Sequence, residues 1–252
     1  MRSEVWDRVT AIKIEGLRKE YKDVVAVEGL DLEIGEGELF SLLGVNGAGK
    51  TTTVKMLSGL TIPTAGDALV CGVSVVKEPD LVKESIDVSM QETAIARKLT
   101  VEENITFYAA LRGHSKEQIE EDKKYVYSVF GLDSVAKRYA GKLSGGWQRK
   151  LSVALALISR PEVLFLDEPT LGLDVIARRE LWETICGLKG KMTVILTTHY
   201  MEEAEALSDR IGVMKDGKLL FVGTKEEMYA ATGKNSVEEA FIEIVTGGER
   251  DA

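Results

Sequence analysis

The sequence predicts an α/β fold with two additions, a small antiparallel sheet near the start and a group of helices inserted in the middle. Three patterns support this prediction. A short apolar run at 39–43 breaks into glycines and restarts with helical spacing, as a strand, loop and helix do. Apolar and polar residues alternate over 9–21 and 24–34, as in half-exposed antiparallel strands joined by a turn. Between 100 and 130 the apolar spacing becomes helical.

Composition limits the class of protein. With 252 residues, of which 44% are hydrophobic and 29% are charged, the chain can bury one substantial core. Its net charge of −9 argues against a protein that holds nucleic acid on a broad basic face. The two cysteines, Cys71 and Cys186, are far apart and have no His or Cys neighbours. We therefore expect neither a zinc site nor a disulfide, which fits a reducing cytosol.

No segment of the sequence has the pattern of a membrane span. Residues 1–8 lack the apolar centre of a secretion signal. The longest apolar runs, such as 151–158, fall far short of the roughly 20 residues that cross a bilayer. We expect any membrane role to go through a partner.

The glycine-rich break after the first apolar strand matches the pattern G-x-x-x-x-G-K-[ST], filled by Gly44, Gly49, Lys50 and Thr51. Small residues let main-chain N–H groups turn inward around an anion, at the positive end of the next helix. We expect Lys50 to reach the β- and γ-phosphates of a nucleotide, Thr51 to hold Mg²⁺ and Thr52 to bind the α-phosphate. The amides expected to cradle the phosphates are those of Asn46, Gly47, Ala48, Gly49, Lys50 and Thr51. A chance glycine turn would give the pattern in about one chain of this length in a hundred.

Two residues on either side of this motif are ambiguous when taken alone. Tyr21, at the end of the first predicted strand, suits either stacking on a base or ordinary packing. Gln91 ends an extended segment and is most simply a surface residue. Before Gln91 we predict a turn at 64–67, a strand at 68–72 and a short helix opened by Pro79. Two capping boxes then mark helix starts in the inserted group, Thr100 with Glu103 and Ser115 with Gln118.

A second glycine-rich helix start, Leu143-Ser144-Gly145-Gly146, precedes the apolar helix at 151–158. The Ser144 hydroxyl and the free amides of Gly145 and Gly146 suit a second anion. One nucleotide does not need two such cradles from one chain. Taken alone, a plain serine cap is the better explanation by roughly three to one.

Polar side chains follow the ends of two predicted strands. The first ends in Asp167 and Glu168, and a carboxylate beside a phosphate loop is expected to bind Mg²⁺, so Asp167 is the metal candidate. Glu168 is then available to polarise a water for in-line attack on the γ-phosphate, and we expect Pro169 to hold it extended. The alternative is that both carboxylates only cap the next helix. His199 follows the second strand, at the edge where α/β sheets bind ligands, and can donate to a γ-phosphate oxygen.

The chain closes with a predicted hairpin around 215–218 and two helices. Both helices have capping-box starts, Thr224 with Glu227 and Ser236 with Glu239. The apolar stripe of the last helix is expected to pack on the core.

Taken together and in this order, these residues resemble the nucleotide-binding subunits of ATP-binding cassette (ABC) transporters. The match covers almost the whole chain, and the ordered set is far more specific than any single motif. Its members are Tyr21, the loop from Gly44 to Thr52, Gln91, Leu143-Ser144-Gly145-Gly146, Asp167-Glu168, Asp174 and His199. Trp147 departs from the family, which usually has Gln there, but the backbone amides of Gly145 and Gly146 are unaffected.

The resemblance implies a P-loop NTPase (RecA-like) core with an N-terminal antiparallel β subdomain and an inserted α-helical subdomain. Within a single domain of 1–252, the core with its β subdomain corresponds to 9–91 and 160–222, the helical subdomain to about 92–159 and the C-terminal helices to 223–252. It also implies ATP and Mg²⁺ as cofactors and a head-to-tail homodimer, in which Ser144, Gly145 and Gly146 close over the partner's ATP.

The resemblance further implies individual roles. Glu168 is the catalytic base, Lys50 and His199 stabilise charge, Gln91 links the metal site to the partner interface, and Asp174 communicates between cassettes. Gln91 also counts with Thr51 and Asp167 among the metal-site residues.

The single-cassette length and the run 223–247 look most like ATP-binding subunits of bacterial or archaeal ABC-2-type exporters. This likeness implies ATP hydrolysis coupled to export through a separate integral-membrane permease, a cytoplasmic position on the inner face of the membrane, and no nucleic-acid partner. Two alternatives stay open. A soluble regulatory ABC ATPase would usually have two cassettes or long coiled coils, and a small-molecule kinase would have no reason for the Ser144 segment.

Overall fold

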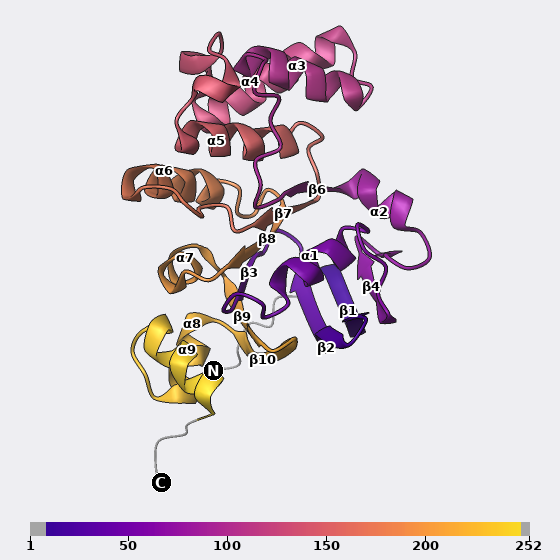
Figure 1. Ribbon diagram of the computed structural model, residues 1–252, viewed down its shortest axis with the longest axis vertical. Coiled ribbons are helices and arrows are strands. Elements are labelled where there is room, and N and C mark those ends of the chain that lie inside the picture. Colours follow the sequence, from indigo (N-terminus) through magenta and orange to yellow (C-terminus); the bar gives the residue numbers. More distant parts are fainter. Residues whose placement is uncertain (1–8, 248–252) are drawn as a thin grey trace.

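The computed structural model describes residues 9–247 as a helical lobe, two sheets and a pair of C-terminal helices (Figure 1). The helical lobe stands at the top of the view, the sheets lie below it, and the C-terminal helices lie at the bottom. Residues 1–8, for which we predict no secretion signal, and 248–252 lie outside the described residues.

The N-terminal sheet is antiparallel, as the alternating pattern predicts. Its strands are β1 (Thr10–Tyr21), β2 (Val24–Gly35), β4 (Ala65–Val70) and β5 (Val73–Ser74), in the order β2-β1-β4-β5. Strand β4 begins within the predicted turn at 64–67, because β1 is long enough to pair Arg18 with Ala65. Gly66 permits this pairing, since its φ is +74° and a Cβ there would lie 2.2 Å from the carbonyl oxygen of Gly16.

The larger sheet has the strand order β10-β9-β3-β8-β7-β6, and its strands are parallel except for the β9–β10 hairpin. They are β3 (Leu39–Leu43), β6 (Ile86–Ser89), β7 (Val163–Asp167), β8 (Thr193–Thr198), β9 (Arg210–Lys215) and β10 (Lys218–Gly223). Because β3, β8 and β7 are parallel neighbours, their carboxyl ends meet at one edge of the sheet. The glycine loop, Asp167, Glu168 and His199 all follow these ends, so the topology brings them to one place.

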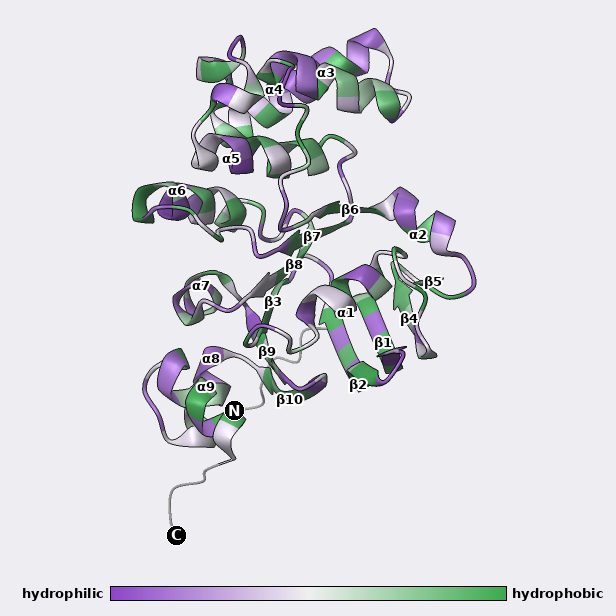
Figure 2. Cartoon of the chain, in the orientation of Figure 1, coloured by the Kyte–Doolittle hydropathy of each residue, from purple (hydrophilic) through white to green (hydrophobic). Residues whose placement is uncertain are grey.

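The central strands are buried on both faces. In β7, Leu164 and Leu166 pack into one hydrophobic cluster with the helical lobe, whereas Val163 and Phe165 pack into another with β1 and β2. Figure 2 shows these central strands as largely hydrophobic. Burial on both faces explains why the strands read as continuous apolar runs rather than as alternating patterns.

The helical lobe consists of α3 (Val101–Leu111), α4 (Lys116–Phe130) and α5 (Gly145–Ala156), with two 3₁₀ turns, η1 (Leu132–Val135) and η2 (Ala140–Lys142), before α5. Both predicted capping boxes are present in full, at Thr100 and at Ser115. The remaining helices of the core are α1 (Lys50–Leu57), α2 (Pro79–Ser85), α6 (Val175–Cys186) and α7 (Met201–Leu207). Pro79 is the first residue of α2, as predicted.

The C-terminal helices are α8 (Lys225–Thr232) and α9 (Val237–Thr246). The predicted apolar stripe of α9 is confirmed, because Val237, Ala240 and Phe241 pack into a third cluster with β9. The capping box at Thr224 is complete. At Ser236 the hydroxyl accepts from the Glu239 amide, but the reciprocal bond is not formed, because the more extended backbone of Ser236 (φ −139°) turns its own amide away.

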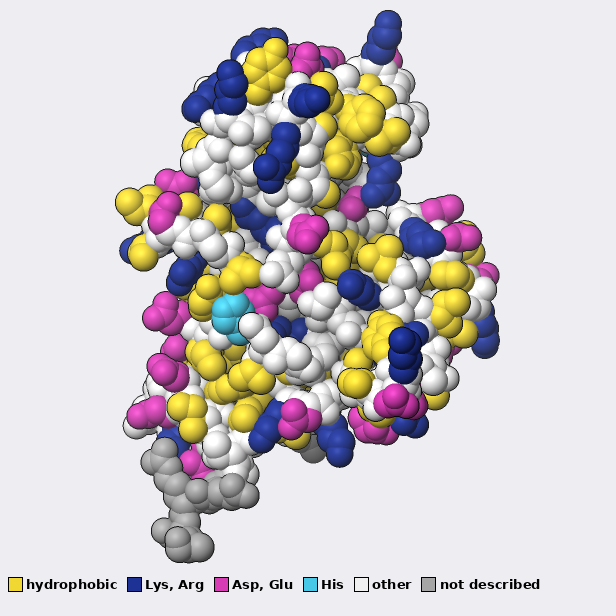
Figure 3. Space-filling model, in the orientation of Figure 1, with side chains coloured by type: hydrophobic (Ala, Val, Ile, Leu, Met, Phe, Trp, Pro, Cys, Tyr) yellow, Lys and Arg dark blue, Asp and Glu magenta, His cyan; other side chains and the backbone are white. Residues whose placement is uncertain are grey.

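On the face shown in Figure 3, basic side chains predominate over the helical lobe at the top, whereas basic and acidic side chains are mixed below it. Hydrophobic side chains gather over the helical lobe at the top of that view. In α3, Phe107 and Leu111 are 46% and 68% exposed.

Candidate nucleotide site

The loop between β3 and α1 has a backbone geometry that requires its glycines. Gly49 has φ +104°, and a Cβ there would lie 2.5 Å from the carbonyl oxygen of Ala26. A Cβ on Gly44 would lie 2.5 Å from the carbonyl oxygen of Met214. Gly49 is also the N-cap of α1 and offers no side-chain bond to the first helical amides. These amides, at the positive end of the helix dipole, remain available to an anion.

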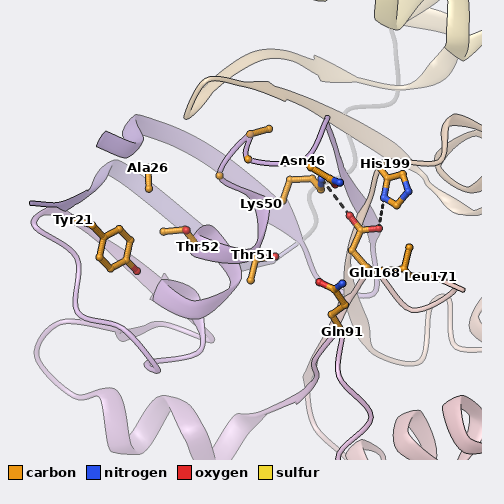
Figure 4. A pocket seen from close by; sticks show the side chains of 13 residues that line it. Tyr21, Ala26, Asn46, Lys50, Thr51, Thr52, Gln91, Glu168, Leu171 and His199 are labelled. Atoms are coloured by element: carbon orange, nitrogen blue, oxygen red, sulfur yellow. Dashed lines mark hydrogen bonds and ion pairs between the residues drawn. The ribbon is translucent and has the colours of Figure 1, made fainter. Parts of the chain in front are cut away.

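Lys50 is held by three oxygen atoms. Its Nζ donates to the carbonyl of Gly44 at 2.6 Å and to that of Val45 at 3.3 Å, and it lies 3.3 Å from Glu168 Oε1 (Figure 4). The side chain is only 5% exposed, so the ion pair with Glu168 is buried. Phosphate oxygens that enter the loop would compete with Glu168 for this ammonium group.

Asp167 and Thr51 form a cluster of oxygen atoms beside the loop. Thr51 Oγ1 lies 3.0 Å from each carboxylate oxygen of Asp167, which also accepts a hydrogen bond from the Thr197 hydroxyl. Asp167 is fully buried, and Gln91 lines the adjoining cavity. Carboxylate, hydroxyl and amide oxygens are the donors that Mg²⁺ takes, so these residues fit that ion.

Glu168 does not adopt the extended conformation predicted from Pro169. Its φ is +49°, in the left-handed region, which costs a non-glycine residue about 1 kcal/mol or more. Proline only disfavours the right-handed helical region at the preceding residue. Hydrogen bonds then decide the conformation, because the Glu168 amide donates to both the carbonyl and the hydroxyl of Thr197. The simple alternative, helix capping by these carboxylates, is also wrong, since Asp174 caps α6.

His199 approaches Glu168 from the end of β8. Its Nδ1 lies 2.6 Å from Glu168 Oε2, and an ionised carboxylate can only accept, so Nδ1 carries the hydrogen. The ring of Tyr200 lies beside the imidazole, with centroids 4.1 Å apart, and the Arg178 guanidinium lies 4.7 Å from the Tyr200 centroid. These contacts fix the ring and leave Nε2 as the nitrogen that can meet a ligand.

One cavity of about 510 Å³ brings most of the predicted site residues together. Tyr21 belongs to it and is 46% exposed, which favours a stacking position over burial in the core. The lining residues are Tyr21, Ala26, Asn46, Gly47, Ala48, Gly49, Lys50, Thr51, Thr52, Gln91, Glu168, Leu171 and His199.

The Ser144 segment does not belong to this cavity. Ser144, Gly146 and Asp174 line a smaller cleft of about 220 Å³ between the starts of α5 and α6. Ser144 is the N-cap of α5 but makes no side-chain capping bond, so the plain serine cap is not what the structure has. A Cβ on Gly145 would meet nothing within 4 Å, whereas one on Gly146 would lie 2.8 Å from the Cβ of Ala177. Gly146 is therefore needed for packing, and Gly145 is open.

Trp147 is partly buried against the lobe and also lines the Ser144 cleft. Its ring is partly buried against the main hydrophobic cluster and lies 4.9 Å from the Lys150 ammonium. Lys150 in turn bonds to Glu180 of α6 at 2.7 Å. This packing leaves the backbone at Gly145 unobstructed.

Sequence reasoning missed the residues that support the carboxylates from behind. Thr197 faces Asp167 in the neighbouring strand, and that pairing depends on a strand order that local patterns do not give. The buried Arg149 and Glu203 lie far from both carboxylates in sequence. Arg149 lies with Gln148 and Lys150 in a polar run before the apolar residues of α5, so its position in the sequence did not indicate that it is buried.

A phosphate loop that faces strand-end carboxylates across a parallel sheet defines a nucleotide-binding ATPase of the P-loop class. A family model described as ABC transporter matches residues 27–171, more than half of the chain. The chain belongs to the ABC transporter ATPase family, whose cassettes bind and hydrolyse ATP.

Similar proteins agree with this assignment. The daunorubicin/doxorubicin resistance ATP-binding protein DrrA of Streptomyces peucetius is 39% identical over 226 residues, which are 89% of this chain and 68% of DrrA. The human phospholipid-transporting ATPase ABCA3 is 41% identical over 226 residues, but this chain spans only 13% of its length. A solved ATP-binding subunit of an ABC transporter superposes with a TM-score of 0.82 at 26% identity, covering 93% of this chain and 99% of that one. These matches favour the transporter interpretation over the regulatory and kinase alternatives.

Among residues 9–247, no helix combines the length and the apolar character that a membrane crossing needs.

Proposed function

We propose that this chain is the ATP-binding subunit of an exporter, in which two copies close head to tail over two ATP molecules. A separate membrane permease converts the closing and reopening into transport. One observation carries the proposal: the chain has two anion cradles that open on different cavities. The phosphate loop lines a cavity with Glu168 and His199, whereas the cleft at the Ser144 segment contains neither of these residues. A second copy, turned head to tail, would give the unused cradle a nucleotide to bind.

The nucleotide is held by groups that already line the large cavity. Tyr21 stacks on the base, the amides from Asn46 to Thr51 surround the phosphates, and the Thr52 hydroxyl binds the α-phosphate. Thr51, Asp167 and Gln91 would hold Mg²⁺. This ion would supply positive charge to offset the charge of the phosphates.

Glu168 acts as the base that orients and deprotonates the attacking water. Its Oε1 is paired with Lys50 and its Oε2 with His199. When a γ-phosphate oxygen pairs with the Lys50 ammonium group, Glu168 Oε1 becomes free to accept a hydrogen from water. His199 stays hydrogen-bonded to Glu168 Oε2. The His199 Nε2 donates to the γ-phosphate when the ring carries both hydrogens. Asp174, at the Ser144 cleft, is placed to relay the state of the partner's site.

Transport is supported by the relatives' names rather than by the geometry. The Streptomyces peucetius relative is named as an ATP-binding protein of drug resistance, and two thirds of it is covered by this chain. We therefore place the subunit on the cytoplasmic face of the membrane, held there by its permease.

The Glu168→Gln variant tests the chemistry. It keeps the shape of the side chain but removes the base, so ATP binding should persist while turnover falls about 100-fold or more. The matched control is Glu183→Gln on α6, whose side chain is 74% exposed and which should hydrolyse ATP at the parental rate. Normal turnover by Glu168→Gln would contradict the assigned role.

A further inference from the structure

Arg149 is a buried cation in α5, within the helical lobe, yet its hydrogen bonds leave that lobe. The residue is 4% exposed. Its Nε donates to the carbonyl of Pro169 at 2.7 Å and its Nη2 donates to that of Asp167 at 2.9 Å. Its Nη1 donates to the carbonyls of Met90 at 2.6 Å and Gln91 at 3.2 Å.

The acceptors belong to two segments that the mechanism uses. The carbonyls of Asp167 and Pro169 lie on either side of Glu168, the residue with the left-handed φ of +49°. The guanidinium group is planar and presents its donors in a fixed fork, so it holds these two carbonyls at a set distance and orientation. Gln91 lines the nucleotide cavity from the other segment.

A second buried side chain, the carboxyl group of Glu203, bonds to Thr170, the residue after Pro169. Glu203 of α7 is fully buried, and its Oε1 accepts from the Thr170 hydroxyl at 2.9 Å and from Trp182 Nε1 at 2.9 Å. The peptide from Asp167 to Thr170 is thus anchored on one flank by Arg149 and on the other by Glu203. Left-handed backbone at a non-glycine residue persists where surrounding contacts over-determine it, and these contacts do so.

The charge of Arg149 survives its burial. Burial lowers the pKa of the guanidinium to about 10, while the negative charges of Asp167, Glu203 and Glu168 act in the opposite direction. The group therefore stays protonated at neutral pH and can donate to all its acceptors. These acceptors belong to the catalytic strand end and to the Gln91 segment rather than to the helical lobe.

We propose that Arg149 is a positioning residue that holds the Glu168 peptide in its left-handed conformation and ties it to the Gln91 segment. This inference rests on the proposed role of Glu168. Arg149 is buried and does not line the nucleotide cavity, so its effect on turnover passes through Glu168.

The test is a cycle of four full-length proteins: the parent, Glu168→Gln, Arg149→Lys and the double variant. Lysine keeps the charge but replaces the planar guanidinium group by a single ammonium group, which cannot hold both carbonyls beside Glu168. Turnover should therefore fall about 10- to 100-fold. The KM for ATP should stay close to the parental value, whereas the thermal midpoint should fall, because lysine leaves buried carbonyls unpaired. Because Arg149 acts through Glu168, the double variant should be no slower than Glu168→Gln alone. Lys123→Gln, which removes a partly buried cation from α4, is the control and should behave as the parent.

The outcomes separate this inference from the proposed function. If Glu168→Gln is slow and Arg149→Lys has parental turnover, the positioning role is wrong and the role of Glu168 stands. If the double variant is slower than Glu168→Gln by the full factor of Arg149→Lys, Arg149 acts independently and the inference is overturned. Parental turnover by Glu168→Gln would remove the proposed function and the inference together.

A second variant keeps the test decisive if Arg149→Lys does not fold. Thr170→Val removes the hydroxyl that bonds to Glu203 while keeping the size of the side chain. It should lower turnover about threefold or more without changing the KM for ATP, and should have no added effect in the Glu168→Gln background. Parental turnover by Thr170→Val would then overturn the inference.

Discussion

Asp167, the proposed metal ligand, is a buried carboxylate that several hydrogen bonds orient. The hydroxyls of Thr51 and Thr197 both donate to it, and its own carbonyl accepts from Arg149. Such outer contacts fix the direction of the carboxylate oxygens and lower the cost of burying their charge. The residue is therefore oriented toward the loop before any nucleotide arrives.

Replacing Asp167 by Asn tests this role. The amide keeps the size and one acceptor oxygen but removes the negative charge, so the Mg²⁺ concentration for half-maximal ATPase activity should rise about 10- to 100-fold. Titration of MgCl₂ at fixed ATP measures it. Asp133→Asn, at an exposed position in η1, serves as the control. An unchanged Mg²⁺ requirement in Asp167→Asn would show that the metal is held elsewhere.

The sequence predicted the residues that line the nucleotide cavity better than the buried residues that support them. His199 follows an apolar strand directly, and Lys50 and Thr51 follow another through the short glycine loop, so position along the chain is enough to bring them to one edge. The φ of Glu168 was mispredicted from its neighbour Pro169, because tertiary hydrogen bonds outweigh that local preference. Arg149 was missed because its acceptors lie in other segments of the chain.

At the scale of elements, three helices meet behind the catalytic strand end. Arg149 of α5 and Glu203 of α7 bond to the segment after β7, and Trp182 of α6 donates to Glu203. Burial raises the pKa of Glu203 above its ordinary value of 4.5. The folded protein therefore holds this proton more tightly than the unfolded chain does.

This difference makes stability depend on pH. Between about pH 4.5 and the higher folded pKa of Glu203, the folded state binds more protons than the unfolded state, so stability falls as pH rises. Glu203→Gln removes the titration and keeps an acceptor for Thr170 and Trp182. Its free energy of unfolding, relative to the parent, should rise with pH by up to about 1.4 kcal/mol per pH unit crossed. Urea unfolding at several pH values measures it, and a pH-independent difference would rule out the assigned titration.

Elements with clear boundary residues were predictable from the sequence. The capping residues Thr100, Ser115 and Thr224 begin helices as predicted, because each satisfies exposed amides locally. The start of β4 could not be predicted in this way. Gly66 looks like a turn residue, and it joins the sheet only through its close approach to Gly16. The order of the parallel strands likewise depends on packing between distant segments.

At the scale of the whole molecule, the helical lobe carries an exposed apolar surface on α3. Phe107 and Leu111 project there, beside a cavity lined by residues of α3, β6 and α5. We propose that the membrane permease covers this surface, because clustered exposed apolar side chains mark sites of protein association.

The paired substitution Phe107→Ser and Leu111→Ser tests this surface. Both side chains lie outside the nucleotide cavity, so ATP turnover by the isolated subunit should stay parental. Retention on membranes that contain the permease should fall, as a sedimentation assay would measure. Ile242→Ser in α9, which is 42% exposed, is the control. Undiminished retention of the paired variant would place the permease contact elsewhere.

In the proposed dimer, the phosphate loop of one copy and the Ser144 segment of the other bind the same ATP molecule. Light scattering of Glu168→Gln with Mg²⁺ and ATP should give the mass of two chains, and without ATP the mass of one. Adding Gly145→Asp tests the interface, because a side chain there meets nothing within 4 Å in one chain but would place a carboxylate against the partner's phosphates. The double variant should bind ATP and remain a monomer. A monomeric Glu168→Gln protein with ATP bound, or a double variant that dimerises as well as Glu168→Gln, would contradict the claim.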